Sequence, residues 1–236
     1  MVPRKPGLLL LVWSAVFTCA LGAGSCDDRG TVYAPSEQGL PKTPNQLVLA
    51  LRNAYFRVDA SAIDALLHPD FTFRYDPTDA DSLGLADRWV RAREMEFTTN
   101  MFSGRPGLRV DGTRQPPLDL INAFAGQLTP ADGSVWTTVR SGPYAGTLTR
   151  MFYANWFSQY EELDTDFVQG FNQFYVIEES LPGRYGEPIA VYRLLHWHDL
   201  GLTPGSVGKH QTISWARLKA KFRTIPDPVR SDPPPP

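Results

Sequence analysis

The chain has 236 residues, of which 42% are hydrophobic, and its 23 basic and 25 acidic side chains give a formal net charge of −2 at pH 7. A chain of this size can bury one good hydrophobic core, so we expect one domain rather than two. The slightly acidic balance argues against a nucleic-acid-binding protein, which would carry a basic stripe.

Residues 1–25 have the pattern of a secretory signal peptide. Arg4 and Lys5 form a basic start, an apolar run follows, and small residues lead up to Cys26. The run of about 14 residues is short for a bilayer span, so an uncleaved anchor is the less favoured interpretation. Cleavage would remove Cys19 and leave Cys26 as the only mature cysteine, without a partner for an internal disulfide.

The segment "LGAGSC" at positions 21–26 resembles a bacterial lipobox, in which small residues precede the cysteine that receives the lipid. It predicts lipidation of Cys26 and a lipoprotein anchored to a membrane of the bacterial cell envelope. Ala23 departs from the pattern, because a larger aliphatic residue is commoner at that position. An ordinary signal peptidase could instead cut after Ser25 and release a soluble, secreted or periplasmic protein. Both interpretations export the chain.

The composition of the mature chain predicts three parts. Residues 26–42 are polar, contain Gly and Pro, and lack periodicity, which is typical of a disordered tether. Residues 224–236 form a Pro-rich tail that we also expect to be disordered. The folded domain is therefore expected to comprise residues 43–223.

The domain is expected to begin with two helices. Thr43 has the pattern of an N-cap, with Pro44 in the first helical position and Gln46 three residues after the cap. Apolar residues then recur at helical spacing as far as Val58. Asp59 can end this helix and start a second, short one that includes Ile63, Leu66 and Leu67.

A strand and a third helix follow. In "DFTFRYDP", at 70–77, aromatic residues alternate with polar ones, which predicts a half-buried strand. The third helix is expected at 85–102, with mixed charges on its outer side. One side of it is formed by Trp89, Ala92, Met95, Thr99 and Phe102.

The second half of the domain is expected to be mostly sheet. Four long strands are predicted at 117–128, 147–162, 166–179 and 188–200. A terminal helix, with Ser214 as its N-cap and Trp215, Leu218 and Phe222 on one face, would pack back on the domain. Helices followed by a meander of strands indicate an α+β fold rather than alternating α/β.

This order of elements, together with three short motifs, resembles the nuclear transport factor 2-like superfamily, which includes SnoaL-like polyketide cyclases and ketosteroid isomerases. The motifs are "LRNAYFRVDASAIDALLHPDFTF" at 51–73, a third helix of the form "W..ARE.E.T.NMF", and the closing strand "YRLLHWHDL". Among its members the chain is most similar to exported bacterial lipoproteins of unassigned function. The resemblance implies a strongly bent, mixed or antiparallel sheet, wrapped as a cone against three N-terminal helices.

The resemblance also implies an apolar pocket inside the cone and, in many members, dimerisation through the convex face of the sheet. The residues expected to line the pocket are Tyr55, Phe71, Phe73, Trp89, Phe102, Trp156 and Phe174. A tyrosine on the first helix can donate a hydrogen bond to a developing oxyanion, as the isomerase relatives do, and Tyr55 is the candidate. It can equally be a packed core residue.

The two histidines of "YRLLHWHDL" are the other candidate site. His196 and His198 are two residues apart in a strand and share a face, whereas Asp199 lies on the other face. A third metal ligand is missing from the pattern, so we expect no metal and place the histidines and Asp199 at an exposed end of the strand. Asp76, Asp79 and Asp81 lack the glycine and glutamate of a calcium-binding loop and are expected to be solvated.

The sequence therefore favours a non-catalytic module that binds a small apolar molecule or a protein at the cell envelope, without a cofactor. A pocket enzyme of the isomerase, dehydratase or cyclase type, with Tyr55 and His196 as its candidate donors or base, is the first alternative. A purely structural envelope dimer is the second. An enzyme requires a paired acid and base in the cavity, whereas a binding module needs only apolar walls and a polar rim.

Overall fold

The computed structural model describes residues 39–77, 79, 86, 88–109, 111–121, 123–160, 165–183, 186–201 and 212–223. The chain divides into two units, Met1–Val32 and Tyr33–Pro236, and every described residue belongs to the second. The predicted signal peptide, Cys26, most of the tether, Asp81 and the Pro-rich tail lie outside the described residues.

The first two helices form as the capping residues predict. Helix α1 spans Pro44–Phe56, and the Thr43 hydroxyl accepts a hydrogen bond from the Gln46 amide at 3.2 Å. The Gln46 side chain reaches back to accept from the Lys42 amide at 2.8 Å, one residue before the cap. Val58 still packs against the core, but it lies outside the helix with a positive φ of 55°, so the helix ends earlier than the apolar spacing predicts.

Helix α2 spans Ala60–Leu66 and begins at Asp59, whose carboxylate accepts from the Ala62 amide at 2.9 Å. Only three residues separate it from α1, so the two helices pack against each other as a pair. The buried side chains of the pair include Leu47, Leu51, Ile63 and Leu66.

The main sheet has the strand order β2-β1-β9-β8-β7-β5, with β10 beside β8 and β6 beside β7. The long strands β7, β8 and β9 are antiparallel neighbours, as the predicted meander requires, whereas β1 and β9 pair in parallel. The strands are β1 (Leu67–Tyr75), β2 (Arg88–Val90), β5 (Phe124–Pro130), β6 (Thr137–Thr138), β7 (Leu148–Gln159), β8 (Thr165–Pro182), β9 (Pro188–Asp199) and β10 (Thr212–Ile213). The predicted α+β class with a mixed sheet is confirmed.

The helix predicted at 85–102 is shorter than expected. Trp89 lies in strand β2, and helix α4 spans only Arg91–Met101. Its buried side chains are Glu94, Phe97, Thr98 and Met101, a different stripe from the expected one. A glutamate on the buried face interrupts the apolar period, and for this reason the pattern indicated the wrong side of the helix.

The strand predicted at 117–128 also begins later, at Phe124. Only an isolated bridge between Leu118 and Tyr160 joins the earlier part of that segment to the sheet. Gly126 allows β5 to approach β7 closely, because a Cβ atom at this position would lie 2.3 Å from the Asn155 carbonyl oxygen. Leu118 is nevertheless fully buried, so the segment contributes to the core without belonging to the ladder.

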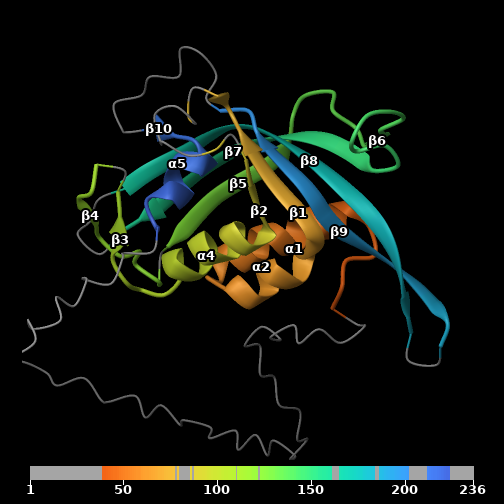
Figure 1. Ribbon diagram of the computed structural model, residues 1–236, viewed down its shortest axis with the longest axis horizontal. Coiled ribbons are helices and arrows are strands. Elements are labelled where there is room, and N and C mark those ends of the chain that lie inside the picture. The colour runs from red at the N-terminus through yellow and green to blue at the C-terminus, as the bar shows by residue number, and fades with distance from the viewer. Residues whose placement is uncertain are drawn as a thin grey trace, which may run out of the picture. The chain divides into compact units, whose positions relative to one another are not determined.

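The sheet arches over the helices, as Figure 1 shows, so that α1, α2 and α4 cover its concave side. Helix α5 (Trp215–Ala220) lies under the same arch and contacts α4 and β8. A small hairpin of β3 (Gly107–Leu108) and β4 (Arg114–Gln115) is adjacent to the end of α5. The predicted terminal helix, with Ser214 as its N-cap, is thus confirmed.

The end of α5 touches the backbone at Gly107. A Cβ atom there would lie 2.1 Å from the Lys221 carbonyl oxygen, a backbone atom that cannot rotate away. We expect Gly107→Ala to loosen α5, at a cost of about 1–3 kcal/mol in unfolding free energy, and to speed hydrogen exchange in residues 212–223. The matched control is Gly112→Ala in the same hairpin. The positive φ of 80° would strain an alanine there too, but its Cβ atom would meet no other atom within 4 Å. Equal exchange in residues 212–223 of both variants would contradict this packing.

Candidate functional site

The concave side of the sheet is filled by aromatic rings. We call them the interior cluster: Tyr55, Phe73, Trp89, Trp156, Trp197 and Trp215. Tyr55 of α1 lies with its ring centroid 4.8 Å from that of Trp215 and 5.4 Å from that of Trp156. Helix α5 contributes Trp215 to the middle of this cluster, where its ring also meets Trp197 at 5.6 Å. The cone is therefore packed with side chains from its own C-terminal helix.

All seven residues expected to line an apolar pocket are buried in this packed region: Tyr55, Phe71, Phe73, Trp89, Phe102, Trp156 and Phe174. Several of them contact one another through close ring pairs, such as the stacked Phe73 and Trp89 rings at 4.5 Å. None of the seven lines the open pocket that the described residues form elsewhere.

The interior cluster encloses an ion pair. Lys219 of α5 lies with its Nζ atom 2.7 Å from Oε1 of Glu94 on α4, and the two side chains are 0% and 1% exposed. The other carboxylate oxygen of Glu94 accepts a hydrogen bond from Trp89 Nε1 at 2.9 Å. Burial lowers the pKa of Lys219, and the neighbouring Glu94 carboxylate opposes that shift.

Tyr55 lies close to this pair, and its side chain is 0% exposed. Burial, and then the negative charge of Glu94, raise the pKa of Tyr55 well above its usual value of 10.0. Its hydroxyl interacts with that of Thr98, but neither makes a well-formed hydrogen bond with another described residue. A tyrosine with a raised pKa remains a neutral hydrogen-bond donor over the physiological pH range.

Two further carboxylates hold α5 in place. Asp199, at the end of β9, accepts hydrogen bonds from the amides of Ala216 at 2.9 Å and Gly201 at 3.2 Å. Asp79 accepts from the Ser214 hydroxyl and from Arg217 Nε, both at 2.5 Å. Burial raises the pKa of Asp199 to about 6, with Asp79 adding to the shift. The expectation that Asp199 is exposed and Asp79 solvated is wrong, because both are buried.

The histidines face the opposite, convex side of the sheet. His196 pairs in register with Thr72 and Tyr175, its Nδ1 lies 2.7 Å from the Thr72 hydroxyl, and its ring stacks on Tyr144 at 4.3 Å. It is only 2% exposed, so its expected exposed position is wrong, whereas His198 is half-buried. Burial lowers the pKa of His196 to about 4, and the adjacent His198 adds to the shift.

Tyr55 and His196 lie on opposite sides of the sheet, because Trp197, the neighbour of His196, faces the interior cluster. They cannot reach one substrate atom together, as an acid and base pair must. Among the described residues, no group of three histidine, cysteine or acidic side chains is arranged to hold a metal ion.

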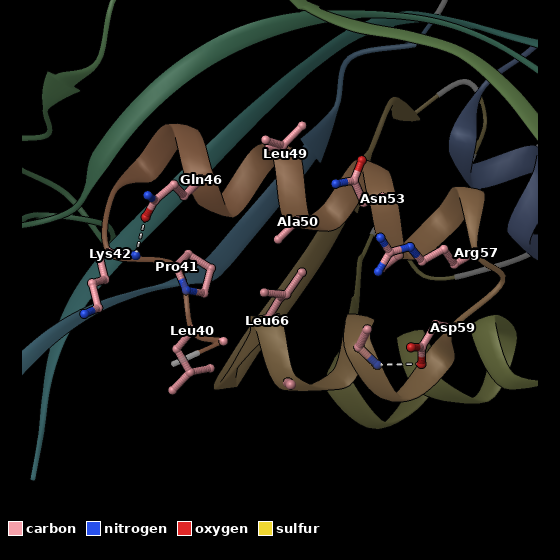
Figure 2. Close-up of a pocket in the computed structure, with 14 residues that line it drawn as sticks. Leu40, Pro41, Lys42, Gln46, Leu49, Ala50, Asn53, Arg57, Asp59 and Leu66 are labelled. Atoms are coloured by element: carbon pink, nitrogen blue, oxygen red, sulfur yellow. Dashed lines mark hydrogen bonds between the residues drawn. The ribbon is translucent and has the colours of Figure 1, made fainter. Parts of the chain in front are cut away.

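An open pocket lies between helices α1 and α2. This groove has a volume of about 270 Å³, and the segment from Gly39 to Lys42 forms one of its walls. Figure 2 shows α1 above and α2 below the groove, with Pro41 and Leu40 at one end and Arg57 and Asp59 at the other. The apolar lining comprises Leu40, Pro41, Leu49, Ala50, Ala54, Ala62, Ala65 and Leu66.

The rim of the groove is polar and carries Lys42, Gln46, Asn53, Arg57 and Asp59. The Asp59 carboxylate already caps α2 and accepts from the Ser61 hydroxyl at 2.7 Å, whereas Lys42 and Arg57 are exposed. An apolar floor with a cationic rim suits a small, mostly apolar molecule that carries an anionic or polar end.

Sequence reasoning missed both the groove and the buried ion pair. The groove forms between residues that separately belong to two amphipathic helices and a predicted tether, so no local motif marks it. Lys219 does carry a signal, because it follows Trp215 by four residues and therefore lies on the same helical face. Glu94 precedes Phe97 and Met101 by three and seven residues, which places it on their face as well.

No family model matches the chain, and no curated protein matches it. Solved structures do. A provisionally assigned aromatic ring hydroxylase from Novosphingobium aromaticivorans is 18% identical with a TM-score of 0.43, over 68% of this chain and 87% of that one. An NTF2-like protein of unknown function in nutrient uptake from Rhodospirillum rubrum is 15% identical with a TM-score of 0.37, over 64% and 92%.

The S. rosetta CaMKII hub is 12% identical with a TM-score of 0.39, over 67% of this chain and 97% of that one. The neighbours thus include proteins of the superfamily that the sequence motifs resemble. The identities and TM-scores are too low to transfer an activity, ligand or partner to this chain.

Opposite pH dependences are expected from the two buried titrating groups. The pKa of His196 falls from 6.5 to about 4, so the stability associated with it is present above pH 6.5 and is lost on acidification towards pH 4. The pKa of Asp199 rises from 3.8 to about 6, so its contribution is greatest in acid and is lost as the pH rises through 6. Each effect amounts to about 3 kcal/mol at most.

We therefore expect the unfolding free energy of the wild type, minus that of His196→Gln, to fall between pH 6.5 and 4. As the pH is lowered over nearly the same range, the unfolding free energy of the wild type minus that of Asp199→Asn should instead rise. Urea unfolding at several pH values measures both. The double variant lacks both groups, so each single variant compared with it should show only the slope of the group that it retains. Difference curves that stay level would show that neither group titrates as its surroundings indicate.

Proposed function

We propose that the chain is an exported, lipid-anchored binding module of the bacterial cell envelope, and that the groove between α1 and α2 binds a small, largely apolar molecule with an anionic or polar end. The observation that carries this proposal is the contrast between the two candidate sites. The interior of the cone is filled by the interior cluster, whereas the groove is open, apolar at its floor and polar at its rim.

The N-terminal sequence supports export. A basic start, an apolar run and "LGAGSC" precede a mature chain whose only cysteine would be its first residue. None of the helices among the described residues has the length and apolar character needed to cross a bilayer. One wall of the groove, residues 39–42, is the last part of the predicted tether, so a ligand bound there would be held near the membrane by a short connection.

The convex face of the sheet supports the further proposal of a homodimer. It presents half-buried apolar side chains, Met151, Tyr153, Phe157, Phe167 and Phe171. Tyr153 and Phe171 already contact each other edge to face at 5.3 Å. Such a surface can bury apolar area against a second copy of the chain.

Lipidation is tested with the chain's own two cysteines. When the full chain is expressed in a bacterium, we expect labelled palmitate to be incorporated into the wild type and Cys19→Ala but not into Cys26→Ala. Labelling of Cys26→Ala, or no labelling of the wild type, would reject the lipid anchor. An unlabelled wild type in the soluble fraction would indicate ordinary secretion, and one that remains in the membrane with an intact N-terminus would indicate an uncleaved anchor.

The groove is tested with the aromatic anion 1-anilinonaphthalene-8-sulfonate as a fluorescent probe. Ala62→Trp should fill the groove and weaken binding of the probe at least about tenfold, a change of roughly 1.4 kcal/mol. Val135→Trp adds the same side chain at an exposed position that does not line the groove, and should leave affinity nearly unchanged. Equal affinity of both variants and the wild type would rule out the groove as the binding site of this probe.

A further inference from the structure

The ammonium group of Lys219 is surrounded like a bound ligand. Its Nζ atom lies 4.0 Å from the ring centroid of Trp197 and 4.1 Å from that of Phe73. Glu94 completes the surroundings with a carboxylate oxygen at 2.7 Å. Two aromatic faces and one carboxylate around a desolvated cation are the arrangement with which proteins recognise alkylammonium groups.

The three surrounding residues all come from the body of the domain and not from α5. We call Phe73, Trp197 and Glu94 the ammonium cage. Each is held by a neighbour that does not depend on Lys219. The Phe73 ring stacks on Trp89, the Trp197 indole donates to Asn172 Oδ1 at 2.8 Å, and Glu94 Oε2 accepts from Trp89 Nε1. A cage supported in this way is preorganised for a cation.

The rest of α5 is also held by charge. Arg217 pairs with Asp79, and Lys221, directly after the helix, pairs with Asp166, both at 2.5 Å, so these two side chains also meet carboxylates of the body. Burying an ion pair such as Lys219 and Glu94 contributes little net stability, because desolvation offsets the attraction. Well-packed apolar residues at both position 94 and position 219 would fill the cone at a similar or lower cost, so stability alone does not explain the ion pair.

We propose that the interior of the cone contains a binding site for an unbranched alkylammonium group, the ammonium cage, and that Lys219 is its intramolecular occupant. An external primary alkylammonium ion takes the place of Lys219 when α5 moves away from the cage. The site is distinct from the groove between α1 and α2 and does not depend on the function proposed for it.

The cage is tested by chemical complementation. Lys219→Ala removes three methylene groups and the ammonium, a fragment that corresponds to the propylammonium ion. We expect propylammonium chloride to raise the melting temperature of full-length Lys219→Ala in a saturable manner, whereas 1-propanol or sodium chloride at equal concentration does not. The melting temperatures of the wild type and of Lys219→Met, whose side chain refills the space without a charge, should not rise, because the cage is already filled in nearly all molecules.

The carboxylate provides the matched control. Introducing Glu94→Gln into the Lys219→Ala variant should weaken the apparent affinity for propylammonium by at least about tenfold, because the charged hydrogen bond is lost. A response to propylammonium no larger than to 1-propanol, or one that survives Glu94→Gln, would overturn the cage. If Lys219→Ala does not fold in buffer, the yield of folded protein on dilution from urea, with and without propylammonium, gives the same comparison.

Replacement of Lys219 in the intact protein is tested by hydrogen exchange. In the wild type, butylammonium chloride should speed exchange in residues 212–223 relative to equal concentrations of sodium chloride or 1-butanol, while exchange in α1 is unchanged. Equal rates in all three solutions would overturn the claim that an external cation replaces Lys219.

Discussion

The structure depends on keeping the concave face of one strongly bent sheet dry. Strands β7, β8 and β9 are long enough for twist to accumulate, so the sheet curves and leaves a deep hollow rather than a flat face. Helices α1, α2 and α4 cover only one side of that hollow. Its remaining volume is occupied by α5, which carries Trp215 into contact with Tyr55, Trp156 and Trp197.

The position of α5 determines where charge can be buried. Because α5 lies against α4 and the end of β9, its basic side chains and backbone amides meet Glu94, Asp199 and Asp79 inside the domain. Desolvation of these groups moves the pKa of Asp199 upward and that of Lys219 downward, each towards its neutral form. These buried ion pairs and hydrogen bonds therefore fix one position of α5, which apolar packing alone would hold less selectively.

The same packing separates the surfaces on which the chain can act. The interior is closed by its own C-terminal helix, the convex face carries His196 beneath Tyr144, and the groove lies outside the core between α1 and α2. The open pocket among the described residues therefore lies on the helical side of the fold. The buried tyrosine and the histidine are on opposite sides of the sheet, so they cannot act together on one substrate atom.

Local patterns in the sequence predicted much of the fold. The caps at Thr43, Asp59 and Ser214 begin helices as expected, since a side-chain oxygen that satisfies the first amides acts within one turn. The alternation of Phe71, Phe73 and Tyr75 and the order of the long strands were also predictable, because both depend on the period of the strand. The start of α4 was not, because Trp89 joins a strand through pairing with β1, which no local window contains.

The sequence by itself determined the class of the fold, the order of its main elements and the motifs on which the predicted export depends, because each follows from residues that are close along the chain. Only the tertiary structure decided that the cone is filled, that Lys219 meets Glu94 across 125 positions of sequence, and that the open pocket lies between α1 and α2. These features depend on contacts between segments that become neighbours only when the sheet bends, so packing and desolvation determine them and local sequence patterns do not.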